Sequence, residues 1–143
     1  MSGIERFPSI IADIMSSPVI TVGIDAKVID AAKIMARNKK GCVIVMKGEK
    51  AVGIITERDL LERVLAEGKD YSKMVVEEVM SSPLISIGKN TPILEAMRIM
   101  RRHDIRRLAV IEGDQLVGII TDKDILKAVA TLALVSFRPL LER

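Results

Sequence analysis

The chain has 143 residues, of which 49% are hydrophobic and 29% charged, a balance that supports a packed core and argues against intrinsic disorder. Aromatic residues make up 2%, so the core must be aliphatic and few side chains are available for stacking on single-stranded nucleic acid. The net charge of +3 is a weaker basic bias than a typical nucleic-acid reader carries.

Cys42 is the only cysteine, which excludes an internal disulfide framework and suits a reducing compartment. No apolar signal segment follows Met1, and the longest apolar run, 128–137, is shorter than the roughly 20 residues that a bilayer-spanning helix needs. We therefore expect a cytoplasmic protein with no membrane partner.

An internal repeat with an offset of 65 positions, as from residue 52 to residue 117, organises the sequence. Met-Ser-Ser-Pro begins at residues 15 and 80, and Val-Gly-Ile-Ile-Thr-x-x-Asp begins at residues 52 and 117. No gap is needed between these matches. We predict one repeat over 8–68, a second repeat over 73–135 and a C-terminal tail over 136–143.

Each repeat opens with a short amphipathic turn, at 10–15 and at 75–80. Ser-Ser-Pro ends this turn, because the residue before a proline is pushed out of the α region. A short strand is predicted next, at 19–22 in repeat one and at 84–87 in repeat two. A helix with an apolar face follows the strand in both repeats.

Asp25 is the expected N-cap of this helix in repeat one, and Asn90 or Thr91 is the expected N-cap in repeat two. Two apolar runs joined by a loop containing glycine then predict a hairpin within 42–55 and another within 107–120. A final helix begins at the threonine of the repeated motif.

The predicted fold class is α+β, with α/β character: two tandem β-α-β-β-α repeats packed sheet to sheet about a pseudo-twofold axis. One repeat of about sixty residues buries too little apolar surface to be stable alone, so two copies are expected to share a core. Grooves on the axis would be flanked by both strand-to-helix junctions.

The last helix, from 121 to about 135, is apolar on nearly every side. Such a helix is expected to be buried, and a chain this small has little of its own to cover it. We therefore predict a homodimer in which a second copy covers this helix.

The duplicated unit closely resembles the cystathionine-beta-synthase (CBS) domain family in its tandem form, the Bateman module. The resemblance is carried by Met-Ser-Ser-Pro followed by Val-Ile or Leu-Ile, by His-Asp-Ile-Arg-Arg-Leu-Ala-Val at 103–110, and by Gly-Ile-Ile-Thr-x-x-Asp in both repeats. It implies a regulatory sensor of adenosine-containing ligands without an obligatory cofactor. AMP, ADP or ATP is expected first, with S-adenosylmethionine and NAD as alternatives.

The repeated Thr-x-x-Asp, at Thr56 and Asp59 and again at Thr121 and Asp124, fits a helix capping box. That structural role alone would account for these residues. The resemblance implies a second role, in which Asp binds ribose hydroxyls and Thr binds a phosphate or ribose oxygen. Both roles can coexist, because a carboxylate has lone pairs enough for two sets of donors.

Arg58 and Lys123 precede the two aspartates, where a cation could reach a phosphate; plain surface charge is the alternative. The resemblance also implies an adenine slot formed by the first strand of each repeat and by the isoleucine before each threonine. Ordinary core packing is the alternative role of these residues. The slot residues are Val19, Ile20, Thr21, Ile55, Leu84, Ile85, Ser86 and Ile120.

Arg106 and Arg107 end the helix-to-strand connection of repeat two, where members of the family often place His or Arg against phosphates. Guanidinium groups match phosphate oxygens in a bidentate manner. A solvated basic turn is the alternative. Because repeat one has Gly41 and Cys42 at the matching positions, we predict two unequal sites, one strong and one weak or empty.

Two other functions remain open at this point: a structural or oligomerisation module with degenerate sites, and nucleic-acid binding through the basic stretch 98–107. The sequence offers no catalytic or metal site, because Cys42 and the sole histidine, His103, lie far apart and no phosphate-binding glycine fingerprint is present. The expected partners are an adenine nucleotide, a second copy of the chain and a regulated protein that the sequence does not identify.

Overall fold

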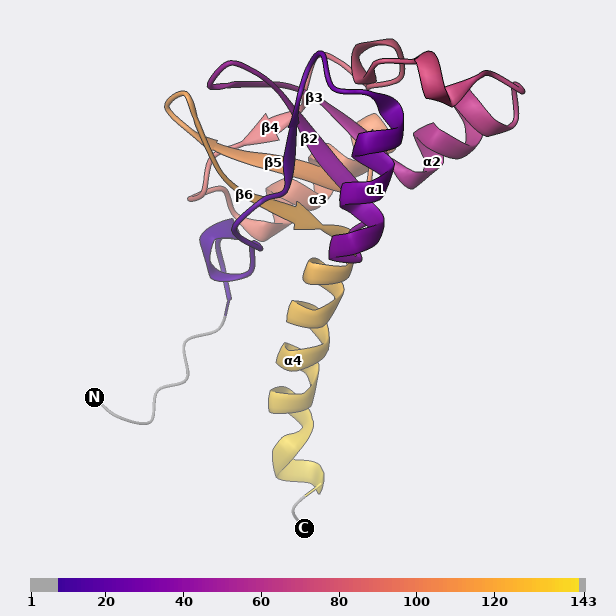
Figure 1. Ribbon diagram of the computed structural model, residues 1–143. Helices are drawn as coiled ribbons and strands as arrows, with labels where there is room; N and C mark the ends of the chain where they lie inside the picture. The colour runs from indigo at the N-terminus through magenta and orange to yellow at the C-terminus, as the bar shows by residue number, and fades with distance from the viewer. Residues whose placement is uncertain (1–7, 142–143) are drawn as a thin grey trace. The chain divides into compact units, whose positions relative to one another are not determined.

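The computed structural model describes residues 8–141 of the chain and the side chains of residues 8–137 (Figure 1). Repeat one forms β1 (Thr21–Gly23), α1 (Val28–Asn38), β2 (Cys42–Lys47), β3 (Lys50–Thr56) and α2 (Glu57–Leu60). Repeat two forms β4 (Ser86–Ile87), α3 (Ile93–His103), β5 (Arg107–Glu112), β6 (Gln115–Thr121) and α4 (Asp122–Leu141). The predicted order β-α-β-β-α is confirmed in both repeats.

Each repeat builds one three-stranded sheet. In the first sheet β1 runs parallel to β2, and β2 pairs with β3 as an antiparallel hairpin. In the second sheet β4 runs parallel to β5, and the strand order is β4-β5-β6. The hairpins turn through Gly48 and Gly113, whose φ angles of 62° and 59° lie in the left-handed region that glycine tolerates. The α+β class is therefore confirmed.

The chain folds into two compact units whose boundaries differ from those of the repeats. The first-repeat unit comprises residues 18–85 and the loop 113–116. The second-repeat unit comprises the described residues up to Ser17, together with 86–112 and the chain from Val117 onward. The opening turn of each repeat thus belongs to the unit that holds the rest of the other repeat.

The opening turns are short 3-10 helices, at Ile11–Asp13 and Val76–Glu78, and each is followed by a residue that pairs with a sheet edge. Ser81 exchanges two backbone hydrogen bonds with Ile54 of β3, at 2.9 and 3.1 Å. Ser16 does the same with Ile119 of β6, at 2.9 and 3.0 Å. The first serine of each Ser-Ser-Pro motif therefore pairs with a sheet edge, which the interpretation of the motif as a helix breaker did not predict.

Glycine permits this close approach in both units. A Cβ atom on Gly53 would lie 2.7 Å from the Met80 Sδ atom. A Cβ atom on Gly118 would lie 2.6 Å from the Met15 Sδ atom. The glycine of Val-Gly-Ile-Ile is thus explained by the segment that packs across the strand, since real Cβ atoms do not come this close to a heavy atom.

The predicted caps of α1 and α3 are wrong, because the N-caps are Lys27 and Pro92, and neither provides a side-chain hydrogen bond. Backbone carbonyls supply the partners instead. The Val28 N–H donates to the Met74 carbonyl at 2.9 Å, and the Ile93 N–H donates to the Ser9 carbonyl at 3.1 Å. The opening segments therefore cap these helices from elsewhere in the chain, which local sequence could not indicate.

The first strands are also shorter than predicted, because β1 and β4 begin at Thr21 and Ser86 and the two residues before each lie outside the strand. The cores are aliphatic, as the composition required. The core of the first-repeat unit includes Val22, Val28, Ala31, Met35, Val43, Ile44, Val45, Ile55, Val64, Val76 and Val79. The core of the second-repeat unit includes Ile11, Ile87, Ala96, Met100, Leu108, Ala109, Val110, Ile120 and Ile125.

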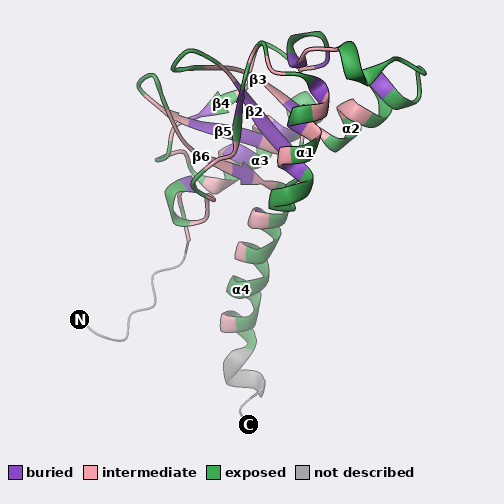
Figure 2. Cartoon of the chain, in the orientation of Figure 1, coloured by how far each residue is buried: buried purple, intermediate pink, exposed green. Residues whose placement is uncertain are grey.

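The final helices differ between the repeats. Helix α2 gives way to a π-helical turn at Leu61–Leu65, whereas α4 continues without interruption to Leu141. Beyond Ile125, which is buried, the described part of α4 is mostly exposed (Figure 2). Its own unit therefore covers little of this helix beyond its first turn, and the cover by a second copy stays a prediction.

Candidate functional site

Thr56 and Asp59 form a complete capping box at the junction of β3 and α2. The Asp59 Oδ2 atom accepts from the Thr56 N–H at 2.8 Å and from the Thr56 hydroxyl at 3.0 Å. The Asp59 N–H in turn donates to the Thr56 Oγ1 atom at 3.2 Å. The predicted cap is confirmed, and it holds the carboxylate in one orientation.

Thr121 and Asp124 repeat this geometry between β6 and α4. The Asp124 Oδ2 atom accepts from the Thr121 N–H at 2.9 Å and from its hydroxyl at 3.0 Å, and the Asp124 N–H donates to Thr121 Oγ1 at 3.2 Å. In both boxes only Oδ2 takes part. Each carboxylate therefore keeps a second oxygen, Oδ1, outside the capping box, where it can accept from hydroxyl groups of a ligand.

Arg63 distinguishes the two junctions. Its Nε atom lies 3.7 Å from Asp59 Oδ1, and its Nη1 atom donates to the carbonyls of Val79 at 2.8 Å and Met80 at 3.2 Å. The position matching Arg63 in repeat two is Ala128, so α4 has no arginine there. Arg63 thus fastens the helix that carries Asp59 to the opening segment of repeat two, within the first-repeat unit.

Replacing Arg63 with methionine keeps the apolar stem and removes the guanidinium. We expect a loss of about 1 kcal/mol in the free energy of unfolding, because two carbonyls lose a charged donor that is itself half-exposed to water. Arg98→Met is the matched control, since the ion pair of Arg98 with Glu95 is an exposed pair at 3.5 Å. Urea denaturation of both variants measures the difference; equal losses would contradict the role given to Arg63.

The structure places the backbone of Arg106 beside the Thr121–Asp124 junction. The Asp122 N–H donates to the Arg106 carbonyl at 3.0 Å, directly after the capping threonine. Arg106 is exposed and Arg107 is half-buried. Near the junction of repeat two there are therefore two consecutive arginines, one directly before β5 and one at its first residue.

The matching contact in repeat one joins the Glu57 N–H to the Gly41 carbonyl at 3.0 Å. Cys42, which replaces the second arginine, is buried at the start of β2 and pairs in register with Thr56. Gly41 and Cys42 therefore occupy the same places at the first sheet that Arg106 and Arg107 occupy at the second. Whether this difference makes the two sites unequal in affinity stays a prediction.

Arg58 and Lys123 are both exposed on the first turn of their helices. The Arg58 Nε atom lies 2.8 Å from Glu62 Oε1, in a pair whose side chains are 73% and 56% exposed. In this structure Arg58 is thus an exposed surface charge paired with Glu62. Its predicted role toward a phosphate would require the guanidinium to share or leave Glu62.

The predicted slot residues divide between the two units. Val19, Ile20 and Thr21 belong with Leu84 and Ile85 to the unit of Asp59, whereas Ser86 belongs to the unit of Asp124. Of these, Thr21 and Ser86 are exposed and the others are half-buried. The half-buried members have the partial exposure that an apolar slot needs.

Ile55 and Ile120 are different, because both side chains are completely buried. Ile55 belongs to a core cluster that includes Val43, Val45 and Val76. Neither isoleucine presents surface to a ligand in this structure, so core packing is the role that the structure shows for them.

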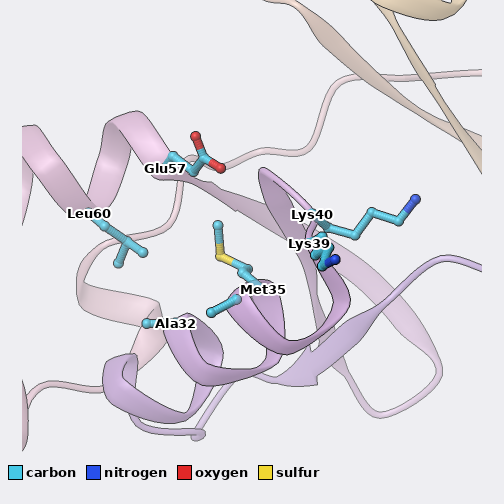
Figure 3. Close-up of a pocket in the computed structure, with 7 residues that line it drawn as sticks. Ala32, Met35, Lys39, Lys40, Glu57 and Leu60 are labelled. Carbon is cyan, nitrogen blue, oxygen red and sulfur yellow. The ribbon is translucent and has the colours of Figure 1, made fainter.

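A hollow of about 420 Å³ lies between the C-terminal half of α1 and the start of α2 (Figure 3). Met35 and Leu60 form its apolar part, and Lys39, Lys40 and Glu57 stand at its edge. A second hollow of about 500 Å³ occupies the matching place between α3 and α4. Neither hollow includes the capping threonines or aspartates, so these are separate features from the two junctions.

Three residues near the junctions were not predicted as site residues: Ser16, Ser81 and Arg63. The two serines lie beside the strands that lead into Thr121 and Thr56, through the edge pairings with Ile119 and Ile54. Their repeated Met-Ser-Ser-Pro motif was the available signal. Arg63 gave no signal, because its partners are backbone carbonyls 16 and 17 positions away in sequence.

The described residues contain no group of three or more His, Cys, Asp or Glu side chains placed to hold a metal ion. Among these residues there is also no helix of the length and apolar character needed to cross a membrane.

The family model described as CBS domain matches the chain twice, over residues 11–66 and 76–131. The CBS domain-containing protein YhcV of Bacillus subtilis is 33% identical over 117 residues, which cover 82% of this chain and 83% of YhcV. The chain spans 62% of the length of another relative, the uncharacterized protein MJ0450 of Methanocaldococcus jannaschii, with 32% identity over 117 residues and 80% of this chain covered.

Solved structures share the fold. The hexameric CBS-CP12 protein from bloom-forming cyanobacteria has a TM-score of 0.78 and 34% identity, with 85% of this chain and 72% of that chain covered. The CBS domain pair of protein MJ0100, solved in complex with 5′-methylthioadenosine and S-adenosyl-L-methionine, has a TM-score of 0.77 and 27% identity, with 85% and 96% covered. One relative is thus an oligomer, and another is a complex with two adenosine-containing ligands.

Proposed function

This chain belongs to the CBS-domain family as a tandem pair, and we propose that it is a regulatory sensor that binds an adenosine-containing small molecule. AMP, ADP or ATP is the ligand expected first, with S-adenosylmethionine and NAD as alternatives. The chain would act by binding and not by catalysis, and it would pass the signal to a protein that it regulates.

The observation that carries this proposal is the duplicated carboxylate. Asp59 and Asp124 are each oriented by two hydrogen bonds to Oδ2, so Oδ1 is already held in place and could accept from a ligand with little further loss of side-chain entropy. A ribose offers two neighbouring hydroxyl donors, and a helix N-terminus favours the phosphate of a nucleotide. The complex of protein MJ0100 supports the same ligand class in a relative.

Arg106 and Arg107 support a stronger site at Asp124 than at Asp59. Guanidinium groups bind phosphate oxygens in a bidentate manner, and the matching residues of repeat one, Gly41 and Cys42, cannot. We therefore expect calorimetry to resolve two classes of site for a phosphorylated ligand. Equal affinities at two sites would contradict this part of the proposal.

A structural module is the second candidate, because the capping boxes explain Thr56, Asp59, Thr121 and Asp124 without any ligand. The two candidates differ in one measurable property. A sensor is stabilised by its ligand, whereas a scaffold with degenerate sites melts at the same temperature with or without it.

The deciding experiment is thermal unfolding of the wild-type chain in AMP, ADP, ATP, NAD and S-adenosylmethionine. A ligand at about a hundredfold above its Kd should stabilise the fold by about 3 kcal/mol. Binding to a duplex or a single strand that weakens steeply with added salt, together with no response to nucleotides, would instead favour the basic stretch 98–107 as a nucleic-acid site.

The quaternary part of the proposal is a homodimer. The described residues of α4 between 128 and 137 include no charged side chain, and most of them are exposed. Contiguous exposed apolar surface of this kind marks an interaction site in a soluble protein.

A further inference from the structure

The second carboxylate oxygen of Asp59 already has a cation beside it. The Arg63 Nε atom lies 3.7 Å from Asp59 Oδ1, which is beyond hydrogen-bonding distance but close enough for an ion pair. The Asp59 side chain is 12% exposed, and its Oδ2 atom is used by the capping box. A ligand and Arg63 would therefore draw on the same oxygen.

Two backbone carbonyls hold this cation in place. The Arg63 Nη1 atom donates to the Val79 carbonyl at 2.8 Å and to the Met80 carbonyl at 3.2 Å. Val79 is completely buried, so this anchor belongs to the core of the first-repeat unit. The ordering entropy that weakens most surface ion pairs is thus already lost, and the guanidinium stays beside Asp59 without help from the ion pair itself.

The backbone around Arg63 also differs from its counterpart in repeat two. Residues 61–65 form a π-helical turn, in which the Ala66 N–H donates to the Leu61 carbonyl at 2.8 Å, five positions back. The matching residues 126–130 lie in the uninterrupted helix α4. Because a π turn holds more residues than an α turn, it changes the direction in which Arg63 leaves the helix, and such turns are frequent at functional sites.

Repeat two has no equivalent of this arginine. Ala128 occupies the matching position, and a methyl side chain carries no charge and cannot reach a carboxylate four residues earlier. The Oδ1 atom of Asp124 therefore has no competitor from this position, while its capping box has the same geometry as that of Asp59. The two repeats thus differ at one helix position that bears directly on the oxygen left for a ligand.

We propose that Arg63 is an internal competitor for the ligand at Asp59, so that the site at Asp124 fills first and the site at Asp59 fills only at higher ligand concentration. This inference rests on the adenosine-binding function proposed above. Arg106 and Arg107 would distinguish the sites through phosphate, whereas Arg63 acts on the oxygen that receives the ribose. The two sites should therefore stay unequal for a ligand that has a ribose but no phosphate.

Calorimetry with adenosine tests this inference, because adenosine has the ribose hydroxyls and no charge. The Asp124→Asn background leaves Asp59 as the intact site. Adding Arg63→Met should lower the dissociation constant about threefold to tenfold, or make an undetectable site measurable, although the same change lowers stability. Arg63→Lys keeps the charge and should stay within about twofold of the background. Arg98→Met, which removes an exposed arginine from another helix, is the control and should do the same.

Each other outcome overturns a defined part of the argument. Weaker adenosine binding after Arg63→Met would make Arg63 a binding residue, and unchanged or absent binding would leave it a purely structural contact. Equal affinities for adenosine at the two sites of the wild-type chain would also refute the competition. All of these results leave the sensor function intact if a nucleotide still binds. A wild-type chain that binds neither adenosine nor any ligand of the thermal screen would refute both proposals together.

Discussion

The Asp124→Asn substitution is expected to weaken nucleotide binding roughly 30- to 150-fold at the stronger site. The substitution removes the negative charge and one acceptor that would receive the ribose hydroxyls, a loss of about 2–3 kcal/mol for charge-assisted hydrogen bonds. It leaves a side-chain oxygen that can still accept from the Thr121 N–H, so the helix cap survives. Isothermal titration calorimetry with whichever nucleotide stabilises the wild-type chain gives the measurement.

Asp59→Asn is the matched control for this experiment. It makes the same chemical change in the same capping geometry, but in a junction with Gly41 and Cys42 where the other has two arginines. We expect it to affect only the weaker class of site. A larger loss from Asp59→Asn than from Asp124→Asn would reverse the assignment of the two sites. Unchanged binding in the double variant would exclude both aspartates as the ribose clamp.

The Gly118→Val substitution should lower the free energy of unfolding by about 3 kcal/mol, which corresponds to a fall of roughly 10 °C in the melting temperature. A Cβ atom there would lie 2.6 Å from Met15 Sδ and 3.2 Å from the Ser16 carbonyl oxygen. A branched side chain must displace the segment that carries both atoms. The two backbone hydrogen bonds between Ser16 and Ile119 would be strained or lost with it.

Two further variants show whether this clash is the cause. Gly23→Ala is the control, because a Cβ atom on Gly23 meets nothing within 4 Å, and its melting temperature should stay close to that of the wild type. Adding Met15→Ala to Gly118→Val should recover part of the lost stability by freeing the space that Met15 fills. A Gly118→Val variant that melts with the wild type would show that the edge pairing contributes little.

Local pattern and duplication together predicted the elements of this fold. The alternation of apolar runs, the hairpin glycines and the capping Thr-x-x-Asp are all short-range signals. Each of them occurs in both repeats, so the same element was predicted twice. Arg106 and Arg107 were recognised at the end of the helix-to-strand connection of repeat two, and only the fold shows that this connection lies beside the end of β6.

The features that sequence could not predict are those in which one segment acts on a distant one. Lys27 and Pro92 begin helices without side-chain caps because the backbone carbonyls of Met74 and Ser9 satisfy the first N–H groups. Arg63 likewise acts on carbonyls of residues 79 and 80. Such contacts involve backbone atoms that every residue has, so no residue type marks them.

The α4 helix shows the opposite limit. Its apolar character was plain in the sequence, which predicted a second copy as its cover, and the helix does extend beyond the cover that its own unit provides. Sequence reports how much apolar surface an element carries. It does not report which chain covers it.

Because the opening turns are exchanged between the two units, cleavage in one repeat would affect the unit built mainly from the other. Residues up to Ser17 belong to the unit built from repeat two, and residues 74–85 belong to the unit built from repeat one. Proteolytic loss of the N-terminal segment would therefore remove the edge partner of β6, more than a hundred positions along the chain, and leave the edge pairing of β3 with Ser81 in place. Neither repeat could be cut out along its sequence boundaries, or inherited singly by another protein, with its own fold complete.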